Sequence, residues 1–320
     1  MELVVEPRLG RVDTVPSLAV HGAQGPRVRL EVVTTDAAGH RWRSSGEYPV
    51  GQDGVLMIDD VERPWWDMAF ADPEAVPVAF TAPDTELRYD LSVAADGEVA
   101  RADLRRSWGP TRPAEDLPGT GFVLRVYRPD DVQGPASAVV VVPGSTGLSA
   151  MAPTAALLAA HGYVAAVLGY MQERGLPPAF RQIPVESILG GLRAFAELPE
   201  VDDARMGVLA VSVGTVAALV TLSGADAPTV GSVVVESPTH VVWQALAGGG
   251  PPPKAPMLTP RRRGPAVRAD PWGEAARPDA AHAARVAVLP PSAVRGAGGA
   301  AGLPGGPRRV RRRRRRGDPH

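Results

Sequence analysis

Cysteine and asparagine are absent from the 320-residue chain, and lysine occurs once, at Lys254, among 34 basic residues. The absence of cysteine excludes disulfide frameworks, thiolate metal sites and a cysteine nucleophile. No apolar run approaches the about 20 residues that a membrane-spanning helix needs. The N-terminal residues also lack the basic and then apolar pattern of a signal peptide. We therefore expect a soluble, cytoplasmic protein without a membrane partner.

Charge is distributed unevenly along the chain, although the formal net charge is only −1. The last 70 residues hold about 16 basic and about 4 acidic side chains, which leaves an acidic remainder. Gly, Pro, Ala and Arg dominate residues 249–320, so this segment cannot bury enough apolar surface to offset its ordering entropy. We expect a disordered tail. Its Arg308–Arg316 run would contact nucleic acid only non-specifically, because no aromatic or folded reader accompanies it.

Residues 1–111 have the pattern of an all-β domain. Short apolar or alternating segments recur between turn signals such as Asp53-Gly54 and Asp96-Gly97. The expected strands are 18–21, 28–34, 55–58, 76–81 and 88–92. This spacing predicts an immunoglobulin-like antiparallel sandwich of about seven strands.

A linker is expected at 112–119, and the pattern then changes to strands that alternate with helices over 120–248. Strands are expected at 122–127, 138–142, 164–168, 206–211 and 232–235, and helices at about 152–161, 184–198 and 213–222. Val-rich strands separated by helices predict a parallel sheet covered on both faces.

The most informative motif is Ala210-Val211-Ser212-Val213-Gly214, between an apolar strand and a helix of small residues. It matches the G-x-S-x-G nucleophile elbow of α/β-hydrolases, with Ala in the first glycine position. The tight turn requires small residues at both ends. It lifts the Ser212 hydroxyl to the N-terminus of the next helix, where the Val213 amide can stabilise an oxyanion. Ser212 is therefore the predicted nucleophile.

A second motif, Val142-Pro-Gly-Ser-Thr-Gly147, follows another apolar strand. In α/β-hydrolases the corresponding loop supplies the other oxyanion donor, here the amide of Ser145 or Thr146. A phosphate-binding P-loop is excluded because the Gly-Lys-Ser/Thr ending is missing. His240, just past the strand at 232–235, is expected to line an acyl pocket, because it comes too early for the general base.

Taken together and in order, these elements resemble the acyl-CoA thioesterase / bile acid-CoA:amino acid N-acyltransferase family in its bacterial form. The resemblance covers residues from about 10 to about 254. The segments that carry it are 65–68, 139–147, 161–163, 175–178, 183–186, 201–202, 205–207, 210–214 and 237–243.

The resemblance implies an acyl-CoA thioester hydrolase that acts in fatty acid metabolism through an acyl-enzyme on Ser212. CoA is then part of the substrate, and no cofactor or metal is implied. An amino acid N-acyltransferase is a second candidate, although Ser at 212 is more similar to the thioesterase members. A dienelactone-hydrolase-like esterase is a third, although such enzymes usually lack the N-terminal β-domain. A catalytically inactive fragment is the fourth.

The C-terminal region departs from the family pattern. Members of this family continue with further strands that deliver an acid and then a catalytic His, and here the Arg-rich tail stands in that place. Asp270, Asp279 and His282 lie in the tail, but none follows an apolar strand, so no triad acid or base is assigned. A frameshift near residues 253–257 of a GC-rich gene would explain this composition.

Overall fold

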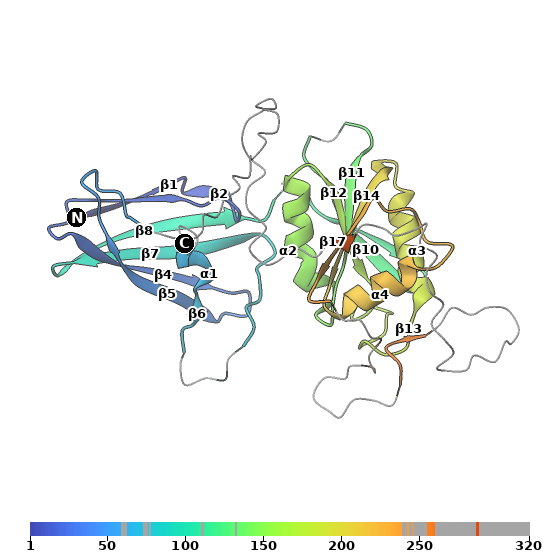
Figure 1. The fold of residues 1–320 in the computed structure, drawn as a ribbon. Helices are drawn as coiled ribbons and strands as arrows, with labels where there is room; N and C mark the ends of the chain where they lie inside the picture. Colours follow the sequence, from blue (N-terminus) through green and yellow to red (C-terminus); the bar gives the residue numbers. More distant parts are fainter. Residues whose placement is uncertain are drawn as a thin grey trace, which may run out of the picture. The chain divides into compact units, whose positions relative to one another are not determined.

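The computed structural model describes residues 1–58, 63–72, 76, 78–109, 112–131, 133–238, 242, 245 and 255–259, and the backbone of 286–287. Figure 1 shows a strand-rich N-terminal part and an α/β part, which are treated in turn. None of the described helices has the length and apolarity that a membrane crossing requires.

Among its described residues, the N-terminal part contains eight strands and one short helix. A six-stranded sheet has the order β2-β8-β7-β4-β5-β6, and β1 pairs separately with β3. The elements are β1 (Glu2–Glu6), β2 (Leu9–Arg11), β3 (Ser17–His21), β4 (Arg27–Thr35), β5 (Arg41–Pro49), α1 (Arg63–Trp66), β6 (Ala69–Phe70), β7 (Glu86–Ala95) and β8 (Glu98–Ser107).

The two sheets share one apolar core, which is formed by the alternate, buried residues of their strands. Val28, Leu30 and Val32 are the buried apolar positions of β4, and they belong to one apolar cluster with Leu3 and Val5 of β1. The all-β expectation therefore agrees with the structure. The immunoglobulin-like arrangement is not confirmed, because the strands divide six and two, whereas an immunoglobulin constant-type domain divides four and three.

Two of the expected strands are not seen among the described residues. Val55 and Leu56 make only isolated bridges, and the described residues of 76–81 are not in a strand. The turn at Asp96-Gly97 does connect β7 to β8, with both residues at positive φ. Here the turn residues correctly predicted where β7 ends and β8 begins, whereas apolar runs alone did not predict a strand. A strand also needs the edge of a neighbouring strand with which to pair.

The α/β part contains a seven-stranded sheet of order β17-β15-β14-β11-β12-β10-β9. The elements are β9 (Glu115–Gly119), β10 (Phe122–Tyr127), β11 (Ala136–Val142), α2 (Gly147–Ala160), β12 (Val164–Gly169), β13 (Ile183–Pro184), α3 (Val185–Ala196), β14 (Val201–Val211), α4 (Val213–Leu222), β15 (Ser232–Glu236), β16 (Leu258–Thr259) and β17 (Val286–Ala287). β13 and β16 form a separate pair.

This order is the arrangement of the α/β-hydrolase fold: β12 lies between β10 and β11, and β10 runs against its neighbours. The sheet is therefore mixed, which corrects the expectation of a purely parallel sheet. The expected linker at 112–119 also needs correction, because Glu115–Gly119 forms β9 and pairs with β10. β9 was missed because its sequence, Glu-Asp-Leu-Pro-Gly, has no strand pattern of its own.

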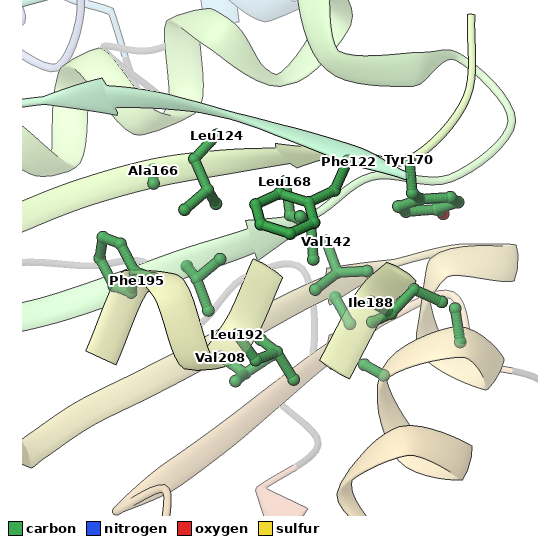
Figure 2. Close-up of a cluster of buried hydrophobic side chains, with 14 of the residues drawn as sticks. Phe122, Leu124, Val142, Ala166, Leu168, Tyr170, Ile188, Leu192, Phe195 and Val208 are labelled. Carbon is green, nitrogen blue, oxygen red and sulfur yellow. The ribbon is translucent and has the colours of Figure 1, made fainter. Parts of the chain in front are cut away.

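Helices cover both faces of this sheet. Val141, Ala165 and Val167 pack with α2, while the alternate strand residues pack with α3 and α4. Figure 2 shows Ile188, Leu192 and Phe195 of α3 beside side chains of the strands, among them Leu124, Leu168 and Val208. All six residues of β12 are consequently buried, as a central strand with two covered faces requires.

Two short strands from the C-terminal region join the α/β part. β16 pairs with β13, and Met257 beside it is fully buried in the main core. Packed structure thus extends through Thr259, which is past the frameshift position expected at 253–257. β17 pairs with β15, so the sheet has a further, two-residue strand beyond 232–235. Most of the expected disordered tail, with Arg308–Arg316, lies outside the described residues.

Candidate active site

Ser212 occupies the sharp turn between β14 and α4, with φ 53° and ψ −128°. This conformation costs a non-glycine residue about 1–3 kcal/mol, so the surrounding contacts must hold it. The backbone amide of Ser212 donates to the Glu236 carbonyl at 2.8 Å. The backbone carbonyl of Ser212 accepts from the amide and the hydroxyl of Thr215 at 3.0 and 2.6 Å. The half-buried Ser212 is therefore fixed at the carboxyl edge of the sheet, where the sequence motif places it.

Gly214 explains why the second small position of the motif is strict. A Cβ atom at this position would overlap the Pro143 carbonyl oxygen and lie 2.6 Å from that of Val142. Val142 is the last residue of β11 and Pro143 follows it, so the constraint comes from the neighbouring strand and its loop as well as from the turn. Ala210, the first small position, is fully buried in the main core.

The loop after β11 lies directly against Ser212. A Cβ atom on Gly144 would be 3.0 Å from Ser212 Cβ and 3.6 Å from Ser212 Oγ. Ser145 and Thr146 follow on the exposed side of this loop, and α2 begins at Gly147. The predicted nucleophile and the predicted oxyanion loop are thus brought together by the pairing of β11 with β14.

Backbone amides at this edge are available as donors. The amide of Val213 is the first of α4, where no intrahelical acceptor exists, and the helix dipole favours negative charge. Within the described residues, the amides of Val213, Ser145 and Thr146 donate to no protein group. Unpaired amides in the turn at Ser212 and in the loop beside it suit an oxyanion better than a neutral substrate group.

Two residues of the site were not singled out from the sequence: Tyr170 and Gln172. Tyr170, just past β12, is buried and donates its hydroxyl to the Pro143 carbonyl; its ring stands edge-on to Phe180. Gln172 Nε2 donates to the Ser145 carbonyl at 3.2 Å. Burial raises the pKa of Tyr170, so it stays a neutral donor. Only the order of strands could have revealed Tyr170 and Gln172, because β12 neighbours β11.

A general base is not found near Ser212 among the described residues. His21 and His40 belong to the N-terminal part, and His161 caps the end of α2 remote from Thr146. His240, the expected pocket residue, and His282 lie outside the described residues. Glu236 is the described carboxylate in register beside Val211, and it is exposed.

A metal centre has no ligands in the part of the chain that the structure describes. No three His, Asp or Glu side chains gather there as they would around an ion. The chemistry that the described residues can support is nucleophilic attack by Ser212 with oxyanion stabilisation by amides.

Neither a family model nor a curated protein sequence matches the chain. Among solved structures, a bacterial heroin esterase is 21% identical, with a TM-score of 0.33, over 38% of this chain and 43% of its own. The hyperthermophilic esterase from the archaeon Pyrobaculum calidifontis is 26% identical, with a TM-score of 0.34, over 39% and 45%. Thermogutta terrifontis esterase 2 is 16% identical, with a TM-score of 0.30, over 39% and 57%. The chain therefore spans about half the length of these esterases.

Proposed function

We propose that the chain is an acyl-CoA thioester hydrolase in which Ser212 is transiently acylated. The observation that carries the proposal is the strained Ser212 between β14 and α4, with the Gly144–Thr146 loop against it. Strain of this kind persists only where surrounding structure enforces it, and it is typical of catalytic residues. The thioester substrate is proposed from the family resemblance of the sequence. A cytoplasmic location is proposed with it.

The reaction follows from the groups in place. The Ser212 hydroxyl oxygen attacks the thioester carbonyl carbon while a base takes its proton, and the amides of Val213, Ser145 or Thr146 stabilise the oxyanion. Collapse breaks the carbon–sulfur bond, and the CoA sulfur leaves as a thiol with that proton. Water then attacks the acyl-Ser212 ester and releases the carboxylic acid. No base or acid partner for Ser212 is found among the described residues.

Thiol release from acyl-CoA of several chain lengths tests the proposal. The 320-residue chain is compared with Ser212→Ala and with a matched control, Ser237→Ala. Ser237 also has positive φ and directly follows the neighbouring strand β15, but no α-helix begins at the next residue. We expect thiol release above background only where Ser212 is intact. Equal release by the wild-type chain and Ser212→Ala would refute the proposal.

Two competing activities are separated by product and substrate. Amino acid N-acyl transfer, the second activity that the resemblance implies, would give an acyl amide when glycine or taurine is added. A dienelactone-hydrolase-like esterase would prefer oxygen esters over thioesters of the same acyl group. The ratio of kcat/KM between matched substrates distinguishes these activities, because it measures differential transition-state binding.

A further inference from the structure

Three consecutive carbonyls of the loop beside Ser212 are each held by a different donor. The Pro143 carbonyl accepts from the Tyr170 hydroxyl, and the Gly144 carbonyl from the Gly147 amide at 3.3 Å. The Ser145 carbonyl accepts from Gln172 Nε2 at 3.2 Å. Two of the three donors thus come from the segment that follows β12.

Fixing a carbonyl also fixes the amide of the next residue. The peptide unit is planar and trans, so the C=O of one residue and the N–H of the next point in opposite directions. The bond from Gln172 therefore sets the plane that carries the Thr146 amide, and the bond from Gly147 sets the plane that carries the Ser145 amide. The bond from Tyr170 does the same for Gly144, the residue that touches Ser212.

The Gln172 side chain occupies the space that a side chain at position 147 would need. A Cβ atom on Gly147 would lie 2.5 Å from Gln172 Oε1, and Gly147 has φ +75°. Gln172 itself has φ 61°, and its backbone amide donates to the Pro177 carbonyl at 2.7 Å. A side chain held from a residue in this sparsely populated conformation indicates that the contact to the loop is enforced.

We infer that Tyr170 and Gln172 are positioning residues, which clamp the loop at its root and near its tip so that the oxyanion amides stay oriented. Neither residue touches the reacting atoms; both act through the loop. The inference rests on the proposed function. Oxyanion donors are effective because they need no reorganisation during the reaction, so loosening the clamp should slow attack by Ser212 without weakening substrate binding.

The test compares Gln172→Glu, Gln172→Ala and Tyr170→Phe in the full chain. Gln172→Glu keeps the shape of the side chain but removes the donor. Gln182→Ala is the matched control, because Gln182 also has positive φ but its side chain makes no hydrogen bond to another described residue. Thermal unfolding shows that each variant folds.

The first readout is hydrogen exchange of peptides that contain residues 143–149, which requires no reaction at Ser212. We expect exchange at least about tenfold faster in Gln172→Glu and Tyr170→Phe and unchanged in Gln182→Ala, because a lost bond lets the loop open locally. Unchanged exchange in both clamp variants would overturn the inference, whatever the fate of the proposed function.

The second readout is the reaction of Ser212 with a fluorophosphonate and the ³¹P resonance of its adduct. We expect about tenfold slower labelling in Gln172→Glu and a shifted resonance, a smaller effect than the 10²–10³-fold loss of a whole donor. For acyl-CoA, kcat should fall while KM stays constant. Faster exchange with unchanged labelling would overturn the positioning role, whereas absent labelling of wild-type Ser212 would refute the proposed function alone.

Discussion

At the scale of single residues, the site depends on two positions without a side chain, Gly144 and Gly214, as much as on Ser212 itself. Gly144 and Gly214 let the end of β11 approach the turn at Ser212 more closely than a side chain at either position would allow. The sequence motif predicted small residues at 210 and 214 from the sharpness of the turn. It could not predict the role of Pro143, because that contact depends on the pairing of β11 with β14.

Gly214→Ala should destabilise the chain, because the added methyl group overlaps the Pro143 carbonyl oxygen and the fixed elbow cannot move away. We expect a loss of about 1–3 kcal/mol in the free energy of unfolding, the usual cost of overpacking. Gly231→Ala is the control, since its added Cβ would make only ordinary contacts at 3.6 Å or more. Urea unfolding measures both variants, and equal stability of the two would show that this contact does not limit residue 214.

Asp36 shows the same reasoning for a charged group in the N-terminal part. Burial alone would raise the pKa of Asp36, but hydrogen bonds outweigh it and lower that pKa from 3.8 to about 2. The donors are the amides of Ala38, His40 and Thr81, the Trp42 indole and the His40 ring. The ionised form therefore stabilises the folded state.

A lowered folded-state pKa means that this stabilisation is complete above the ordinary value of 3.8 and is lost as pH falls through about 2. Asp36→Asn should unfold more easily than the wild-type chain at neutral pH, and the gap should shrink across that window. Chemical unfolding at several pH values checks this, with the exposed Asp90→Asn as control. A gap that does not change between neutral pH and pH 2 would be inconsistent with the charged role of Asp36.

At the scale of elements, strongly patterned segments were predictable and partner-dependent ones were not. The buried runs of β11 and β12 and the start of α4 at Val213 agree with the sequence pattern. β5 and β8 are rich in Arg and Ser and became strands only because β4 and β7 offered them edges. Tyr170 and Gln172 were missed for the same reason: a loop after one strand reaches the site only through the order of strands.

The N-terminal part should fold without the rest of the chain. Every buried residue of its apolar core lies between Leu3 and Leu104, so removing the α/β part deletes no member of that core. Residues 1–109 expressed alone should give a dispersed amide proton spectrum and a cooperative unfolding transition. A random-coil spectrum would show that this core needs support from later residues.

At the scale of the whole molecule, the chain joins a strand-rich part to an α/β part, and the described residues of the α/β part contain some but not all of the groups that a serine hydrolase needs. The predicted nucleophile, Ser212, lies beside the loop that carries the proposed oxyanion donors, and no histidine base is found beside them among the described residues. Serine is a weak nucleophile until a base takes its proton. Oxyanion stabilisation alone leaves a rate of roughly 10³–10⁴ over water, far below the roughly 10⁶ or more of ordinary enzymes.

We therefore expect slow, Ser212-dependent release of thiol from acyl-CoA by the 320-residue chain. Steady-state assays over several acyl chain lengths measure this rate, with Ser212→Ala as the blank. A turnover near about 1 s⁻¹, at the low end of the usual enzyme range, would contradict this expectation. It would show that His240, His282 or another residue outside the described ones supplies the base.

The central claim, that Ser212 is the nucleophile of an acyl-transfer site, is tested most directly by mapping a covalent adduct. The chain, Ser212→Ala and Ser237→Ala are each incubated with a fluorophosphonate, digested and analysed by mass spectrometry. We expect one adduct per chain, on Ser212, which forms in the wild-type chain and in Ser237→Ala and is absent from Ser212→Ala. An adduct on another residue, or equal labelling of Ser212→Ala, would contradict the claim.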